Sequence, residues 1–180
     1  MAKLYFRYGA VGSAKTLNLL AVAHSYRQQN KRVYLIKPQI DTRFGASIIG
    51  SRAGLAQTAD LLVDADTELD CELLRGCHCI LVDEVQFLSE KMIEQLREVT
   101  NALNIPVICY GLRTDFRARL FEGSKRLMEL ADAIEEVKTT CTYCTRKAIF
   151  NLKLMDGRPS WEGPTIELGQ EEKYVPACAV

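Results

Sequence analysis

The chain has 180 residues, and its 23 lysines and arginines balance 23 aspartates and glutamates, so the formal net charge is zero. This balance excludes a protein that holds nucleic acid through bulk positive charge, although it leaves room for a local basic stripe. The length suits one main domain with a small appended module. No apolar run approaches the about 18 residues of a membrane span, and the N-terminus lacks an apolar signal segment, so we expect a cytoplasmic protein without a membrane partner.

Short apolar runs alternate with helix-like stretches over residues 1–138. The runs predict strands at Leu4–Phe6, Arg32–Lys37, Cys79–Val82, Pro106–Tyr110 and Ala133–Val137. Apolar residues at helical spacing predict helices at Thr16–Gln29, Ser89–Leu103 and Ser124–Ala131. Strands that alternate with helices indicate right-handed crossovers and a mostly parallel sheet flanked by helices. The longest irregular stretch begins at Pro38 and ends near Gly54.

The character of the sequence changes after Lys138. Helical periodicity disappears, a turn is expected at Asp156–Pro159, and three cysteines occur at Cys141, Cys144 and Cys178. We therefore divide the chain into an α/β domain, residues 1–138, and a small β-rich module, residues 139–180.

A glycine-containing loop lies between the first predicted strand and the first predicted helix, which is where a phosphate-binding loop belongs. It matches the pattern G-x-x-x-x-G-K-[ST] at Gly9, Lys15 and Thr16, but Ala14 replaces the second glycine. In such loops backbone N–H groups cradle phosphates, the lysine reaches the β- and γ-phosphates, and the hydroxyl binds Mg²⁺. A methyl group at Ala14 would crowd the phosphates, whereas Gly12 keeps the loop adaptable. The alternative is a plain strand-to-helix turn with a surface lysine.

Two further motifs follow predicted strands and are expected at the same edge of the sheet. Asp83 and Glu84 end the apolar run Cys79–Val82, and the carboxyl ends of parallel strands face one crevice. Asp83 would hold Mg²⁺, and Glu84 would polarise a nucleophile. Asp41 and Arg43 follow the second strand, where an arginine can stabilise charge on a phosphoryl group, although a surface ion pair has the same spacing. Together these motifs predict an α/β fold of the P-loop NTPase-like (RecA-like) type.

The chain resembles the thymidine kinases of the tetrameric, zinc-containing type (type II) along nearly its whole length. Each matching segment alone is moderately specific for this family, and the order and spacing of the segments together are highly specific for it. The segments are Tyr8–Thr16, Asp41–Phe44, Ser51–Leu55, Val82–Leu88, Cys109–Arg117, Leu120–Ser124 and Lys173–Cys178. The resemblance implies transfer of the γ-phosphoryl group of ATP, with Mg²⁺, to the 5′-hydroxyl of thymidine or deoxyuridine, in pyrimidine deoxynucleotide salvage for DNA synthesis.

The resemblance also implies roles for individual residues. Glu84 would be the general base for the 5′-hydroxyl, and Arg43 would flank the transferring group. Thr16, Asp83 and Asp41 would hold Mg²⁺. The residues implied for the ATP site are Gly9, Ala10, Val11, Gly12, Ser13, Ala14, Lys15, Thr16, Asp83, Glu84, Val85 and Gln86. Those implied around thymidine are Val11, Phe87, Leu112, Phe116, Phe121, Asn151, Ile166, Glu167 and Tyr174, of which the last four fall where the family's lasso-like loop closes over the base.

The cysteines of the terminal module resemble the family's structural zinc site. Cys141 and Cys144 form a C-x₂-C pair and Cys178 supplies a third thiolate, whereas structural Zn²⁺ takes four ligands in a tetrahedron. In the family the fourth ligand is a Cys or His three residues beyond the third, which would be one position after Val180. Three outcomes therefore stay open: a fourth ligand beyond this sequence, its replacement by water or a distant group, or loss of the site. With zinc, residues 139–180 would form a zinc-ribbon-like lasso module.

The resemblance further implies a homotetramer, feedback inhibition by thymidine triphosphate and no direct binding of nucleic acid. From the residues alone, the alternative is a RecA-like ATPase that acts on nucleic acid. Such a protein needs a basic path, and the basic residues form only a short cluster: Arg113, Arg117, Arg119, Lys125 and Arg126. A non-enzymatic alternative, suggested by Ala14, is a zinc-ribbon interaction module on a degenerate phosphate loop.

Overall fold

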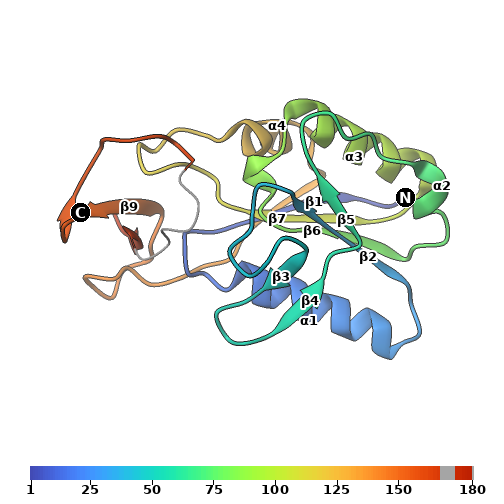
Figure 1. The fold of residues 1–180 in the computed structure, drawn as a ribbon, viewed down its shortest axis with the longest axis horizontal. Helices are drawn as coiled ribbons and strands as arrows, with labels where there is room; N and C mark the ends of the chain where they lie inside the picture. The colour runs from blue at the N-terminus through green and yellow to red at the C-terminus, as the bar shows by residue number, and fades with distance from the viewer. Residues whose placement is uncertain (167–172, 180) are drawn as a thin grey trace.

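The computed structural model describes residues 1–166 and 173–179, and a six-stranded sheet forms its centre (Figure 1). The strand order is β5-β2-β6-β7-β1-β8, and all neighbouring strands are parallel. In chain order these strands are β1 (Leu4–Tyr8), β2 (Val33–Pro38), β5 (Leu61–Val63), β6 (Cys79–Val82), β7 (Val107–Gly111) and β8 (Ala133–Glu136). The helices are α1 (Lys15–Gln28), α2 (Cys71–Leu74), the 3₁₀-helix η1 (Val85–Phe87), α3 (Glu90–Leu103) and α4 (Glu122–Leu130).

Helices cover both faces of the sheet, which explains why its central strands are continuously apolar. Along β6, Ile80 and Val82 join the core under α2, α3 and α4, whereas Cys79 and Leu81 join the core under α1. Successive side chains of a strand point to opposite faces, so a strand that is buried on both sides needs apolar residues at every position. In Figure 1, α3 and α4 lie above the sheet and α1 lies below it. The predicted parallel α/β fold of the P-loop type is confirmed.

The predicted strands and long helices match the structure to within two residues at most ends. Ser89, the first residue of the predicted helix Ser89–Leu103, caps α3 by accepting a hydrogen bond from the N–H of Met92 at 3.2 Å. The prediction missed α2 and three short strands: the edge strand β5 and the hairpin β3 (Ile48–Gly50) and β4 (Ala56–Thr58). Strand β3 lies inside the stretch that was expected to be irregular. Three-residue strands with mixed exposure lack the alternation that signals a strand.

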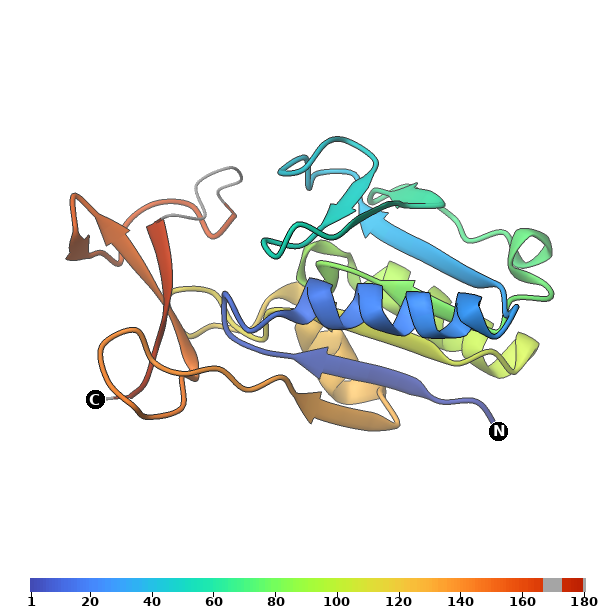
Figure 2. The same ribbon diagram turned by 90° about the horizontal axis from the view of Figure 1, so that it is seen from below.

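The C-terminal segment forms its own antiparallel sheet at the carboxyl ends of the parallel strands (Figure 2). Its order is β10-β9-β11, with β9 at Phe150–Met155, β10 at Arg158–Pro159 and β11 at Tyr174–Ala177. Asn151 on β9 is buried and makes two hydrogen bonds to the loops that follow β1 and β7, at Val11 and Thr114. The small sheet therefore forms a wall of the crevice in which parallel α/β proteins bind ligands. Within the described residues, no helix has the length and apolar character that a membrane crossing requires.

Candidate active site

The loop between β1 and α1 has the form of a phosphate-binding loop. Gly9 is required at its start, because a Cβ atom there would lie 2.4 Å from both the carbonyl oxygen of Val137 and Oγ of Ser13. Lys15 begins α1 and is buried, and its Nζ donates to the carbonyl oxygen of Ala10 at 2.9 Å and to Oγ of Ser13 at 3.3 Å. Burial lowers the pKa of Lys15 to about 8, against the opposing effect of nearby carboxylates. The loop therefore holds its lysine inside the crevice and not at the surface.

Ala14, the residue that replaces glycine in the motif, adopts a left-handed backbone conformation with φ 61° and ψ 29°. Glycine adopts this conformation without strain, whereas an L-residue pays a steric penalty. The loop thus keeps the backbone path that a glycine would give it, and the Ala14 side chain is exposed. The methyl group lines the phosphate cavity without closing it.

Asp83 lies where β6 ends and faces Thr16 of α1. The Thr16 hydroxyl donates to Oδ2 of Asp83 at 3.0 Å and lies 3.3 Å from Oδ1. Burial raises the pKa of Asp83 to about 7, and the adjacent Glu84 carboxylate acts in the same direction. A buried carboxylate beside a second one favours a cation, and a hydroxyl with a carboxylate is the oxygen donor set that Mg²⁺ prefers.

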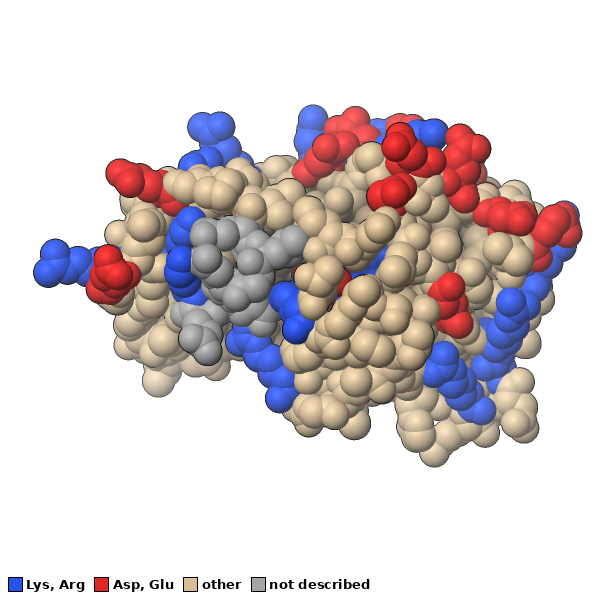
Figure 3. Space-filling view, viewed as in Figure 1, with Lys and Arg blue, Asp and Glu red and all other residues tan. Residues whose placement is uncertain are grey.

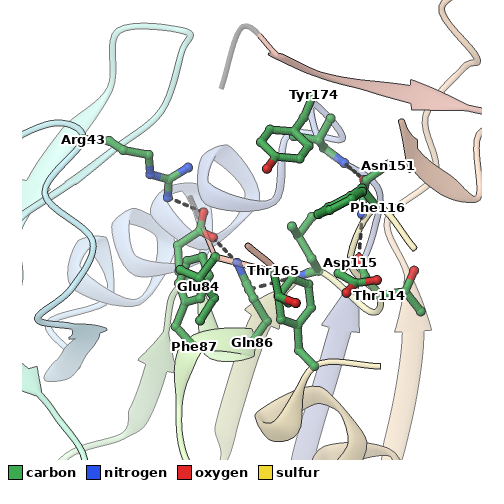
Figure 4. Close-up of a pocket in the computed structure, with 14 residues that line it drawn as sticks. Arg43, Glu84, Gln86, Phe87, Thr114, Asp115, Phe116, Asn151, Thr165 and Tyr174 are labelled. Carbon is green, nitrogen blue, oxygen red and sulfur yellow. Dashed lines mark hydrogen bonds and ion pairs between the residues drawn. The ribbon is translucent and has the colours of Figure 1, made fainter. Parts of the chain in front are cut away.

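Glu84 follows Asp83 with a left-handed backbone, at φ 49° and ψ 39°, and is buried. Two donors hold its carboxylate: Nη2 of Arg43 lies 2.6 Å from Oε1, and Nε2 of Gln86 lies 2.5 Å from Oε2. Figure 4 shows Arg43 and Gln86 approaching Glu84 from different sides. A non-glycine residue in this backbone region stores strain of about 1–3 kcal/mol, and such strain is concentrated at functional sites.

Arg43 bridges two carboxylates that come from different elements. Besides Glu84, its guanidinium binds Asp41 through Nε at 2.6 Å and Nη2 at 3.1 Å. Burial opposes the charged form, but Glu84 and Asp41 outweigh it and raise the pKa of Arg43. Lys37, fully buried at the end of β2, places its Nζ 3.4 Å from Asp41 and 2.8 Å from the carbonyl oxygen of Ile48. Asp41 thus lies against two cations.

Two cavities meet at the carboxyl edge of the sheet. A cavity of about 380 Å³ follows the phosphate loop, and a smaller one of about 80 Å³ lies between the loop after β7 and the small sheet. Four residues line both cavities: Val11, Arg43, Glu84 and Leu112. Arg43 and Glu84 therefore lie at the boundary between the cavity along the phosphate loop and the smaller cavity beside the small sheet.

The structure brings together nearly all of the expected site residues. The smaller cavity is lined by eight of the nine residues expected around thymidine, namely Val11, Phe87, Leu112, Phe116, Phe121, Asn151, Ile166 and Tyr174. The ninth, Glu167, lies outside the described residues. Of the twelve expected at ATP, the larger cavity is lined by Val11, Gly12, Ser13, Ala14, Lys15, Thr16 and Glu84. Gly9, Ala10, Asp83, Val85 and Gln86 are not among its lining residues, and Gln86 lines the smaller cavity instead.

Sequence reasoning gave no role to several other lining residues. Thr114, Asp115 and Thr165 line the smaller cavity. The larger cavity also includes Leu17, Phe44, Gly50, Ser51, Arg52 and Ala53. Phe44, Ser51–Ala53, Thr114 and Asp115 belong to segments of the family resemblance, which was the available signal. Leu17, Gly50 and Thr165 carry no pattern that predicts exposure to a cavity.

Cys141, Cys144 and Cys178 converge in the small module, where their sulfur atoms all lie within 4.8 Å of one another. The sulfurs of Cys144 and Cys178 are 3.6 Å apart, and thiolates at tetrahedral positions on zinc lie about 3.8 Å apart. A hydrogen bond from the N–H of Tyr143 lowers the pKa of Cys141 to about 7, which favours the thiolate that binds a metal. The three cysteines fit a metal ion.

A buried lysine in a strand-to-helix phosphate loop, with a carboxylate pair at the end of a nearby parallel strand, defines a P-loop phosphotransferase. The comparisons agree: the family profile described as thymidine kinase matches residues 2–180. A thymidine kinase of Streptococcus pyogenes serotype M3 is 42% identical over 183 residues, covering 99% of this chain and 95% of the relative. A thymidine kinase of Lactiplantibacillus plantarum is 43% identical over 182 residues, covering 99% and 94%. The chain belongs to the thymidine kinase family.

Among solved structures, the Pif1 helicase from Candida albicans has a TM-score of 0.44 and 12% sequence identity. The match covers 76% of this chain and 36% of the helicase chain. A likeness at this level does not bear on function.

Proposed function

We propose that this protein transfers the γ-phosphoryl group of ATP to the 5′-hydroxyl of thymidine, and of deoxyuridine, as a step of pyrimidine deoxynucleotide salvage for DNA synthesis. The observation that carries the proposal is the shared boundary of the two cavities. ATP phosphates in the larger cavity and a nucleoside in the smaller one would meet at Arg43 and Glu84. Family membership supports thymidine as the acceptor.

Glu84 is the proposed general base. As the 5′-oxygen forms its bond to the γ-phosphorus, the bond from that phosphorus to the β,γ-bridging oxygen breaks, and ADP leaves. The hydroxyl proton passes to the Glu84 carboxylate. Each carboxylate oxygen accepts more than one hydrogen bond, so the contacts with Arg43 and Gln86 leave capacity for the substrate hydroxyl.

Arg43 and Lys15 are the proposed cationic groups for the transferring phosphoryl. The guanidinium is fixed by Asp41, so it needs little rearrangement when negative charge develops on the equatorial oxygens. Lys15 is held within the loop by Ala10 and Ser13 and would exchange these contacts for phosphate oxygens. Thr16 and Asp83 are the groups that would hold Mg²⁺; the proposed third ligand, Asp41, already contacts two cations. When bound, Mg²⁺ would neutralise charge on the β- and γ-phosphates.

The smaller cavity suits a pyrimidine base. Seven of its fourteen lining residues are aromatic or aliphatic, and Figure 4 shows Phe116 and Tyr174 facing the Glu84 side of the cavity. Asn151 uses its amide internally: Oδ1 accepts from the N–H of Val11 at 2.7 Å, and Nδ2 donates to the carbonyl oxygen of Thr114 at 2.8 Å. It therefore connects the small sheet to the phosphate loop, which would fix one wall of the nucleoside site against the ATP site.

A structural zinc ion is proposed at Cys141, Cys144 and Cys178. These residues lie before β9 and just after β11, so a metal there would tie together the two strands that form the wall. Zinc would act only by holding this geometry. A homotetramer, inhibition by thymidine triphosphate, cytoplasmic location and absence of direct nucleic-acid binding remain proposals that family membership supports.

The test is an assay with ATP, Mg²⁺ and thymidine that measures thymidine monophosphate, run on the natural sequence and on Glu84→Gln. The natural sequence is expected to form product. Glu84→Gln should lower kcat by about 10²–10⁴-fold with a nearly unchanged KM for ATP, because it removes a base and keeps the shape. ATP hydrolysis that needs DNA, without thymidine monophosphate, would instead support the nucleic-acid ATPase. Family membership disfavours that alternative, and acidic side chains gather on the upper edge in Figure 3, over α3 and α4.

A further inference from the structure

Gln86, which the family resemblance placed at ATP, has a different setting in the structure. It belongs to η1, is 2% exposed, and lines the smaller cavity. Its Oε1 accepts a hydrogen bond from the N–H of Leu112 at 3.0 Å, and its Nε2 donates to Oε2 of Glu84 at 2.5 Å. Because a backbone N–H can only donate, it fixes which end of the amide faces Leu112, so the NH₂ group must face Glu84.

Gly111, the last residue of β7, makes room for this amide. A Cβ atom at Gly111 would lie 2.5 Å from Oε1 of Gln86 and 2.8 Å from Cγ1 of Val85, both closer than side chains tolerate. On the other side of η1, a Cβ at Gly123 of α4 would lie 2.5 Å from the carbonyl oxygen of Val85. Two glycines from different elements thus allow η1 to be held tightly between β7 and α4.

Glu84 needs such support because its own backbone is strained. Its left-handed conformation is held by its surroundings and not by its intrinsic preference. The charged groups around its carboxylate are Arg43, Lys15 and Asp83, from three other positions of the site. Gln86, which donates to this carboxylate, is itself held by the backbone N–H of Leu112, the residue that follows β7.

We propose that Gln86 is a positioning residue for the phosphoryl transfer: its amide, oriented by Leu112 and accommodated by Gly111, holds the Glu84 carboxylate where the 5′-hydroxyl arrives. Leu112 also lines both cavities, so the same contact links the wall of the nucleoside site to the base. Gln86 touches no reacting atom and acts through Glu84. This inference rests on the proposed function.

The test is a double-mutant cycle with Gln86→Met and Glu84→Gln. Gln86→Met keeps the side-chain volume and removes the amide, and a displacement of about 1 Å in a catalytic group costs on the order of 10²-fold in rate. We therefore expect kcat to fall by about 10–100-fold, with the dissociation constant of ATP within about twofold of the natural value. In the Glu84→Gln background the same substitution should have almost no further effect on kcat, because the group it positions is gone.

Two further variants separate positioning from packing. Gln86→Glu keeps the shape and the acceptor for the N–H of Leu112 but loses the donor to Glu84, so it should not restore kcat. The matched control is Gln95→Met on α3: Gln95 likewise accepts from a backbone N–H, of Leu69 at 2.7 Å, and donates to a carbonyl oxygen, of Thr67 at 3.3 Å. It should cost similar thermal stability and leave kcat unchanged. If Gln86→Met does not fold, Gly111→Ala displaces the same amide with Gln86 in place and should lower kcat likewise.

The inference is overturned if Gln86→Met keeps kcat within about twofold of the natural value. It is also overturned if the decreases in kcat caused by Gln86→Met and by Glu84→Gln multiply in the double variant, or if Gln86→Met weakens ATP binding instead of lowering kcat. These results would leave the proposed function intact, because the natural sequence would still form thymidine monophosphate. A natural sequence that forms none would overturn both.

Discussion

Ala14 carries a side chain at a position where the backbone favours glycine, and Ala14→Gly therefore tests the phosphate loop directly. The left-handed conformation, with φ 61°, costs an L-residue about 1–2 kcal/mol. Glycine also makes the unfolded chain more flexible, which lowers the free energy of unfolding by about 0.4–1 kcal/mol. The net expectation is a free energy of unfolding that rises by about 0.5–1 kcal/mol, which is about 1–4 °C in Tm for a chain of this length.

The consequence for ATP follows from the same geometry. Because Ala14 already has the backbone conformation of the missing glycine, the loop N–H groups should be oriented for phosphate, and the KM for ATP should stay equal or fall. Thermal unfolding and steady-state kinetics measure the two effects. A KM for ATP that rises several-fold, or a Tm that falls, would refute the reasoning.

Two control substitutions separate backbone strain from position. Ala118→Gly changes a residue with φ 60° away from the phosphate loop, so it should raise Tm by a similar amount and leave the KM for ATP unchanged. Ala21→Gly changes an exposed residue within α1 and should lower the free energy of unfolding by about 1 kcal/mol. If Ala118→Gly lowers Tm as Ala21→Gly does, the strain argument fails.

The remaining predictions concern the groups around the boundary of the cavities and the cysteines. Lys37→Met leaves Asp41 without one of its two cations and should lower the free energy of unfolding in urea by about 3 kcal/mol; a change below about 1 kcal/mol would contradict this. Arg43→Lys cannot bridge two carboxylates and should lower kcat by about 10²–10³-fold with little change in thymidine binding; a nearly normal kcat would contradict its role. Cys144→Ser should reduce zinc per chain, measured by metal analysis, and lower Tm; a natural sequence with less than half an equivalent of zinc would argue against the site.

The sequence predicted the main sheet because its strands are buried on both faces. Cys79–Val82 has no polar residue, and the structure gives β6 the same bounds. Strand β5 was missed because it is only three residues long, and two of them are partly exposed at the edge of the sheet. The left-handed backbone at Glu84 could not be predicted, since Glu has no preference for this conformation. The close packing of η1 against Gly111 and Gly123 likewise depends on segments that are distant in sequence.

In the site, the residues that could be predicted are those that belong to short motifs with a fixed spacing along the chain. Lys15, Asp83 and Glu84 belong to such motifs, and the structure brings them to one edge of the sheet. Thr165 was missed because a residue that lines a cavity through its fold position leaves no local pattern. The setting of Gln86 was likewise invisible, because its partner Leu112 is distant in sequence.

The central claim is that the two substrates meet between Arg43 and Glu84. A crystal structure with thymidine joined through its 5′-oxygen to ATP by an additional phosphate tests it most directly. We predict the thymine in the smaller cavity, the adenosine phosphates along the loop at Lys15, and the 5′-oxygen within about 2.6–3.2 Å of a Glu84 carboxylate oxygen. Thymine outside the smaller cavity, or a 5′-oxygen beyond the reach of Glu84, would contradict it.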